Sequence, residues 1–454
     1  MTERSLVDAI SNATLGVDTL WGGDVLSASG TGRFIADCWF SDEPLPVAYT
    51  HPTAARLRES GGVAGRAPDV PAIHAYLSAA DVRAAIDAVR QGARDLADAR
   101  RRRFLEALAD CFDVMADLAL EVIGEGPAVP FERCVRAAIG RAPEPSDPGP
   151  RIERLRQALD VRDDPAGGTG RLRAAVERWR SERLVDPASI ASLAAIRIAE
   201  LDRLSQFRLM PHLPAALASV PRANIEFLPI RDAWFSGSMN YLGRARTEGG
   251  RPQYEATYEI NASLQISIPE FEHLISHEVV PGHVTTFAFL QDLYARGVVG
   301  FEASALTINT RAAALFEGIA NNAILIAHGV TEVGEIDDPD TQIGVLLSQL
   351  QDEAKNQAAW LTWQEGAAEE QVAAALRRDF LVSPERASKL AGAWGRHPLL
   401  GRMCLPAYRA GTEVVARLRR EHPPSVVLPA LYGCRGLVDI VTVQELLESA
   451  DVSR

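Results

Sequence analysis

The chain is organised around one short stretch, HEVVPGH at residues 277–283. It places the imidazoles of His277 and His283 and the carboxylate of Glu278 within a single segment. Apolar residues before it recur at three- and four-residue steps, which predicts a helix. Glu278 falls on the apolar face of that helix, where a charge is costly unless it is paired or bound to a metal ion. The stretch therefore predicts a buried site with metal-binding chemistry.

The pattern is similar to the zinc-protease signature, in which two histidines on one helix face bind zinc and a glutamate acts on water. In that signature the histidines are four residues apart, whereas here they are six apart, and on a regular helix such side chains diverge. We interpret Pro281 and Gly282 as a two-residue bulge that turns His283 back towards His277. His273 and His277 form a competing pair at the ordinary spacing. We favour His283 because such bulges commonly mark functional sites.

A zinc site needs a third ligand from the protein. Glu317 is the candidate, because it interrupts an apolar helical run over residues 312–327. An acid in that setting is costly unless it is coordinated or paired. The alternative to a metal is a salt bridge to Arg311 or to another arginine. Gly318, the next residue, allows a neighbouring backbone or a substrate to come close.

Three elements together resemble the DUF885 family of bacterial proteins, which is similar to the M32 carboxypeptidases and to other helical zinc metallopeptidases. The first is the stretch at residues 277–283, and the second is Glu317 followed by Gly318. The third is Tyr408 with Gly411 three residues later. The resemblance covers roughly residues 200–440, and the first element is its most specific part.

The resemblance implies a site and a fold. His277, His283 and Glu317 would bind one zinc ion per chain, although other divalent transition metals suit the same ligands. Glu278 would act as general base, and Tyr408 would either donate to the oxyanion or simply fill a helix interface. We expect a mainly α protein: a large helical zinc-peptidase-like fold with a small β element preceding the metal-binding helix.

The chain departs from the family pattern beside this metal set. The family carries Pro-Gly-Gln-Ala before the tyrosine, where this chain has residues 402–405. The family also has an Arg, an Asp and a His on the helix between the glutamate and the tyrosine. The matching residues 355–364 offer only Lys355 in place of the Arg. The predicted metal set is kept while its surroundings differ, which indicates a special substrate.

The pattern of the chain changes before the motif. Residues 253–261 alternate, with Tyr254, Ala256, Tyr258 and Ile260 on one face, which predicts a strand. A small β element in this place either offers an edge strand along which an extended substrate pairs or is a small hairpin that covers the core.

Four prolines within residues 141–150 exclude regular structure there and indicate a boundary. We predict an N-terminal helical region at residues 1–140, a Pro/Gly-rich linker region at residues 141–170 and a metallopeptidase-like catalytic region at residues 171–454. Two lobes of one continuous domain fit the same pattern. Further along, Ser383 and Pro384 predict the start of a helix.

Composition narrows the possible partners and locations. The 454 residues carry a net charge of −13, so a nucleic-acid partner is not expected. No apolar run is long enough for a membrane span, and the first residues show no signal peptide. The five scattered cysteines indicate no disulfide framework. These observations predict a cytoplasmic protein with no membrane partner. The cysteines are Cys38, Cys111, Cys134, Cys404 and Cys434.

The predicted function is metal-dependent hydrolysis of an amide or peptide bond in a small-molecule or peptide-like substrate. Water is activated by the metal, and Glu278 takes its proton. The first alternative is a biosynthetic tailoring enzyme that uses the same site on a small amino-acid-derived, ester or amide intermediate. The second is an inactive binding scaffold, which the complete metal set argues against.

Overall fold

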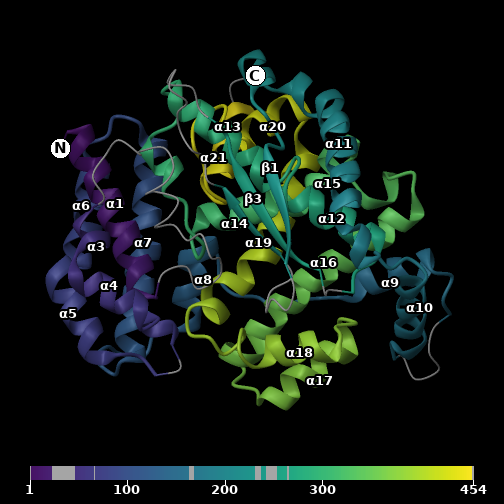
Figure 1. Ribbon diagram of the computed structural model, residues 1–454, viewed down its shortest axis with the longest axis horizontal. Coiled ribbons are helices and arrows are strands. Elements are labelled where there is room, and N and C mark those ends of the chain that lie inside the picture. The colour runs from purple at the N-terminus through teal and green to yellow at the C-terminus, as the bar shows by residue number, and fades with distance from the viewer. Residues whose placement is uncertain are drawn as a thin grey trace.

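Helices form most of the regular structure, and the described residues contain one small sheet (Figure 1). The predicted mainly α fold is therefore confirmed. The computed structural model describes residues 2–22, 46–65, 67–162, 168–230, 237–241, 253–262 and 265–451. Cys38 lies outside them. The four described cysteines are free: Cys111, Cys134, Cys404 and Cys434.

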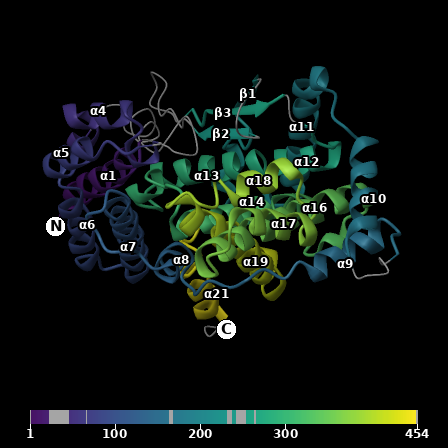
Figure 2. The same cartoon turned by 90° about the horizontal axis from the view of Figure 1, so that it is seen from below.

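The first helices gather at one end of the molecule, drawn in purple and blue in Figures 1 and 2. There α1, α6 and α7 contact one another, and α4 packs on α5. Helix α8 instead reaches the central helices α14 and α19. The bounds are α1 Glu3–Leu20, α3 Val47–Thr50, α4 Pro52–Glu59, α5 Val70–Ala80, α6 Val82–Arg94, α7 Ala99–Val122 and α8 Phe131–Ile139.

The remaining helices include α12, α13, α14 and α19, which carry the predicted site residues. Helix α16 ends at a π-helical turn, Trp360–Gln364, and α19 begins directly after another, Leu400–Cys404. The bounds up to α15 are α9 Gly149–Ala158, α10 Gly170–Ser181, α11 Ile190–Arg208, α12 Ile268–Glu278, α13 His283–Ala295, α14 Arg311–Asn321 and α15 Ala323–His328. The later ones are α16 Pro339–Ala359, α17 Glu369–Asp379, α18 Pro384–Ala391, α19 Leu405–Glu421, α20 Pro424–Leu431 and α21 Thr442–Asp451.

The sheet has the strand order β1-β3-β2, from β1 (Ile225–Ile230), β2 (Gly237–Tyr241) and β3 (Ala256–Asn261). Strand β3 pairs in parallel with β1 and antiparallel with β2. Ala256, Tyr258 and Ile260 are buried on one face, as the alternation predicts. Because β3 is the central strand, the edges of this sheet are β1 and β2, and pairing of an extended substrate along one of them stays a prediction. Figure 2 shows the sheet against α12 and α13.

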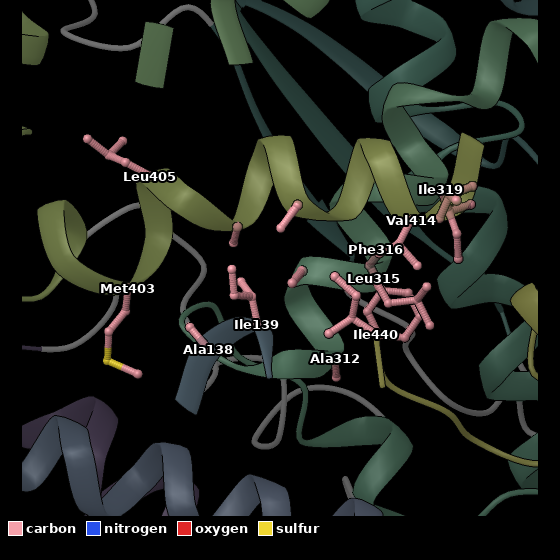
Figure 3. Packing of buried hydrophobic residues seen from close by; sticks show 14 of the residues in the cluster. Ala138, Ile139, Ala312, Leu315, Phe316, Ile319, Met403, Leu405, Val414 and Ile440 are labelled. Carbon is pink, nitrogen blue, oxygen red and sulfur yellow. The ribbon is translucent and has the colours of Figure 1, made fainter. Parts of the chain in front are cut away.

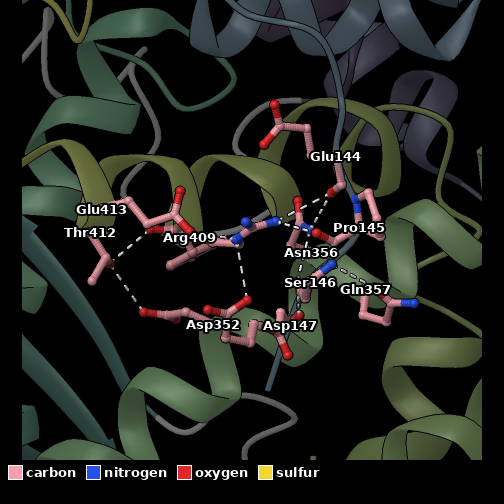
Figure 4. Close-up of polar contacts among 12 residues, drawn as sticks. Glu144, Pro145, Ser146, Asp147, Asp352, Asn356, Gln357, Arg409, Thr412 and Glu413 are labelled. Atoms are coloured by element: carbon pink, nitrogen blue, oxygen red, sulfur yellow. Dashed lines mark hydrogen bonds and ion pairs between the residues drawn. The ribbon is translucent and has the colours of Figure 1, made fainter. Parts of the chain in front are cut away.

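The proline-rich segment crosses the face of α16 and α19 in an extended form (Figure 4). Ser146 donates its backbone N–H to the Gln357 side chain and its hydroxyl to the Glu353 carbonyl, both at 2.8 Å. Arg409 donates to the Pro145 carbonyl at 2.8 Å. The segment is therefore held by polar contacts along its length. The division into residues 1–140, 141–170 and 171–454 stays a prediction.

Helices α14 and α19 form the centre of the hydrophobic core. Figure 3 shows Leu315 and Ile319 of α14 near Val414 of α19, with Ile139 of α8 and Ile440 beside them. Among the described residues, no single helix is long and apolar enough to cross a membrane. The helical stretches Arg311–Asn321 and Ala323–Glu335 reach that length and composition together, with a bend of 49° between them.

Candidate metal centre

The HEVVPGH stretch is a helix, a turn and a second helix. Helix α12 is capped at its start by the Ser267 side chain and ends at Glu278, and α13 begins at His283. The predicted bulge within one helix is therefore wrong: the chain stops one helix and starts another. Gly282 packs on the end of α12 so closely that a Cβ there would lie 1.8 Å from the His277 carbonyl oxygen. Only glycine permits this turn.

The turn is held from both sides. The Thr285 backbone N–H donates to the Val279 carbonyl at 3.1 Å, and Thr286 donates to the Gly282 carbonyl at 2.9 Å. Tyr432, the residue that follows the end of α20, donates its hydroxyl to the Pro281 carbonyl at 2.8 Å. These bonds fix the angle at which α13 leaves the turn, and with it the direction of the His283 side chain.

The break brings the two histidines to the same carboxylate. His277 Nε2 lies 3.4 Å from Glu317 Oε2, and His283 Nε2 lies 3.7 Å from Glu317 Oε1. One ligand atom from each residue lies within 4.8 Å of the others. A tetrahedral zinc ion with ligands at about 2.0–2.2 Å spaces them about 3.3–3.5 Å apart. The two pairs with Glu317 are close to this spacing, so the set fits a metal.

Burial controls the protonation of the three residues. The His277, His283 and Glu317 side chains are 13%, 11% and 19% exposed, so the site is largely buried yet reachable. Burial lowers the pKa of His277 well below its ordinary value and that of His283 to about 4, so both rings are neutral. Burial also raises the pKa of Glu317 to about 8. Glu317 Oε2 is a buried oxygen without a hydrogen-bond partner, an arrangement that a cation would stabilise.

A second layer selects which His277 nitrogen faces the site. Its Nδ1 lies 2.8 Å from Asn321 Oδ1. The Asn321 amide nitrogen donates to Asp352 at 2.8 Å and to the Thr412 hydroxyl at 2.9 Å, so its oxygen must accept from the ring. The Nδ1 position then carries the proton, and Nε2 presents its lone pair to Glu317. The sequence analysis did not predict roles for Asn321, Asp352 or Thr412. The only hint of such a role was the position of Asn321, one helical turn after Glu317.

Glu278, the predicted general base, lies beside the metal set. Its Oε1 is 4.0 Å from His277 Nε2, and its side chain is 16% exposed. Burial raises its pKa to about 7, which suits proton transfer near neutral pH. Tyr258 of β3 is fully buried nearby, and its hydroxyl has no hydrogen-bond partner. Burial and, second, the Glu278 charge raise the pKa of Tyr258 well above its ordinary value.

Tyr408 belongs to the same site. The negative charge of Glu317 and then burial raise its pKa well above the ordinary value, so its hydroxyl keeps its proton. The Lys355 ammonium lies 3.3 Å from the centre of the Tyr408 ring and 3.0 Å from Asp352 Oδ1. Lys355 therefore lies beside Tyr408, and its correspondence to the arginine of the family stays a prediction.

Two glycines explain why Tyr408 and Glu317 are neighbours. A Cβ on Gly318 would lie 2.3 Å from the Gly411 carbonyl oxygen, and one on Gly411 would lie 1.9 Å from that of Ala314. Helices α14 and α19 thus cross with their backbones in contact. The close approach expected at Gly318 is that of a neighbouring backbone.

Three further polar residues lie outside the cluster of potential metal ligands. His273 is buried and its Nδ1 has no hydrogen-bond partner, but it is outside the cluster of potential metal ligands. Arg402 donates to Glu121 at 2.9 Å, and Arg409 lies 3.2 Å from Glu353. These two arginines are therefore occupied in structural pairs.

Comparisons with known proteins find solved structures with a similar fold but no matching family model. No family model matches the chain, and no curated protein matches it. A solved structure described as a "putative lipoprotein" from Colwellia psychrerythraea is 13% identical with a TM-score of 0.51, over 82% of this chain and 67% of that one. Another, described as a "putative lipoprotein of unknown function" from Shewanella oneidensis, is 14% identical with a TM-score of 0.52, over 95% and 83%.

These neighbours correct one prediction. The cytoplasmic location expected from the sequence is contradicted, because both similar structures are described as lipoproteins. The physical basis of that prediction was weak. Unpaired cysteines do not require a reducing compartment, and the first residues of a sequence say nothing about segments outside it.

Proposed function

We propose that this protein is a zinc-dependent hydrolase of the DUF885 type, which cleaves an amide or peptide bond. The observation that carries the proposal is the convergence of His277, His283 and Glu317. Two neutral imidazoles and one carboxylate from three helices present ligand atoms to one point, and one buried carboxylate oxygen there has no hydrogen-bond partner. This is a ligand set of catalytic zinc sites, which keep one further position open.

Each residue has a distinct role in the proposed reaction. A bound zinc ion would supply the Lewis acidity that activates water and polarises a carbonyl. His277 and His283 offer neutral nitrogens, and Asn321 keeps the His277 ring in the required tautomer. Glu278 takes a proton from the attacking water on its carboxylate and delivers it to the leaving nitrogen.

Tyr408 is the proposed donor to the developing oxyanion. Its hydroxyl stays protonated beside Glu317, so it has a proton to share. A single such donor contributes on the order of 10²–10³ in rate. The Lys355 ammonium over the ring and its pair with Asp352 hold this tyrosine in place.

Metal analysis tests the proposal directly. We expect about one zinc per chain in wild type and in His273→Ala, and loss of zinc in Glu317→Ala and His283→Ala. Glu278→Gln should keep zinc but lose hydrolysis of a peptide panel. Bound zinc without peptide cleavage by wild type would favour a tailoring enzyme acting on a small amide or ester. No transition metal in any sample after reconstitution would leave only the binding scaffold.

A further inference from the structure

Arg386, on α18, is a half-buried cation whose Nε is a buried atom without a hydrogen-bond partner. Its Nε–H donates to no partner, and its guanidinium forms no ion pair in the described part of the chain. A buried guanidinium without a partner is costly for the folded state. Burial lowers the pKa of Arg386, and the negative charge of Asp352 opposes this. Such an arrangement is expected where a ligand completes the pairing.

The position of Arg386 links it to the candidate metal centre. Helix α18 packs against α16, the helix that carries Asp352. The charged and titratable groups that act on Arg386 belong to four helices: Asp352 on α16, Tyr408 on α19, Arg180 on α10 and Glu270 on α12. The guanidinium therefore lies within electrostatic reach of groups on these four helices, among them Tyr408 of the candidate site.

The acids around Arg386 already have other partners. Glu270 is held by Arg180, whose Nε and terminal nitrogen reach it at 3.0 and 2.6 Å. Asp352 is held by Lys355 at 3.0 Å and by Asn321 at 2.8 Å. Neither carboxylate forms an ion pair with Arg386, so the positive charge of Arg386 stays available to an incoming anion.

We propose that Arg386 binds a carboxylate of the substrate, next to the bond that is cleaved. The substrate class is then an amide that carries a carboxylate on the part seated between α18 and Tyr408. A guanidinium binds a carboxylate through two parallel hydrogen bonds, and one positive charge matches one negative charge. This inference rests on the proposed hydrolase function and adds its specificity.

The test uses zinc-binding probes that differ only at the far end. Succinic and glutaric monohydroxamates carry a carboxylate there, and their methyl esters do not. Isothermal titration of the zinc-loaded protein should show the better acid at least about tenfold tighter than its ester, the contribution of a charge-assisted hydrogen bond. Arg386→Met should abolish this preference and leave ester affinity unchanged. Arg386→Lys should retain part of it.

Arg377→Met on the neighbouring α17 is the matched control, because Arg377 is exposed and its loss should not alter the preference. Equal binding of acid and ester to wild type, with zinc bound, would overturn the role of Arg386 alone. Absence of zinc or of any hydroxamate binding would overturn the hydrolase proposal and this inference with it. Arg386→Met should also unfold at the same or a higher temperature than wild type. A lower unfolding temperature, or a failure to fold, would show a structural role and overturn the proposal.

Discussion

Two carboxylates buried in neighbouring parts of the molecule have opposite surroundings. Glu353 of α16 is 2% exposed and meets two arginines, Arg151 and Arg409, where the proline-rich segment crosses the helix. Glu317 of α14 meets two neutral imidazoles, those of His277 and His283, and no arginine or lysine forms an ion pair with it in the described part of the chain. The chain neutralises the first acid itself and leaves the second for a cation from outside.

The comparison separates an acid that is paired within the protein from one that we propose binds a metal. Burial raises the pKa of both Glu353 and Glu317, so a raised pKa does not distinguish them. The kind of residue that each carboxylate contacts does distinguish them. Arginine is always charged and completes an ion pair, whereas a neutral imidazole leaves a lone pair and an unmet charge.

The largest expected difference is in zinc binding. Glu317→Gln should weaken zinc binding by about a thousandfold or more, because one of three protein ligands is lost. Glu353→Gln, a matched change, should leave the affinity as in wild type. Competition with a fluorescent chelator measures both constants. Similar losses in the two variants would erase the distinction between the acids.

The reverse ranking is expected for folding. Glu353→Gln should lower the free energy of unfolding by about 3 kcal/mol, because it leaves Arg151 and Arg409 without their shared charge. In zinc-free protein, Glu317→Gln should be neutral or stabilising, since it removes a carboxylate that has no cation. Urea denaturation in the presence of a chelator measures both. A Glu317→Gln protein that is less stable than Glu353→Gln would contradict the comparison.

The layer behind the site should have an intermediate effect. Asn321→Leu removes the acceptor that fixes the His277 tautomer, so zinc affinity should fall about 10–100-fold. Glu317 and His283 remain in place, which keeps the loss below that of a missing ligand. His273→Ala serves as the control, because His273 lies outside the metal set. Unchanged affinity in Asn321→Leu would remove this residue from the site.

The smallest expected effect is a pH dependence of stability. In zinc-free protein the pKa of Glu317 is about 8, far above the value of about 4.3 in an unfolded chain. The folded state keeps a proton that the unfolded state has released, so stability falls as pH rises towards 8. His277 and His283, with lowered pKa values, add little slope above about pH 6.5.

Between pH 6.5 and 8, wild type should therefore lose roughly 1–2 kcal/mol more than Glu317→Gln. Glu278, with a pKa of about 7, titrates in both proteins and cancels in the difference. Denaturation curves at the two pH values, without metal, give the quantity. Parallel losses in the two proteins would show that Glu317 is ionised in the folded state without a metal.

Local patterns in the sequence determined several features. Helical periodicity and alternation predicted the mainly α fold and the buried face of β3. Ser383 and Pro384 predicted the start of α18, where the Ser383 hydroxyl accepts a hydrogen bond from the backbone N–H of Arg386. The predicted ligands His277, His283 and Glu317 come together in space. The periodicity, the alternation and the helix start come from side chains a few residues apart, whose preferences act through the local backbone, whereas Glu317 was indicated as an acid within an apolar run.

Tertiary structure alone decided the rest. The break between α12 and α13 depends on Gly282 packing against the end of the preceding helix. The Asn321 network and the unpaired state of Arg386 depend on helices separated by long stretches of chain. Whether a buried polar group finds a partner is set by which helices meet, and this leaves no periodic trace in the sequence. The sequence determined which chemical groups the site contains, and the packing of the helices decided which of them lack a partner in the described part of the chain.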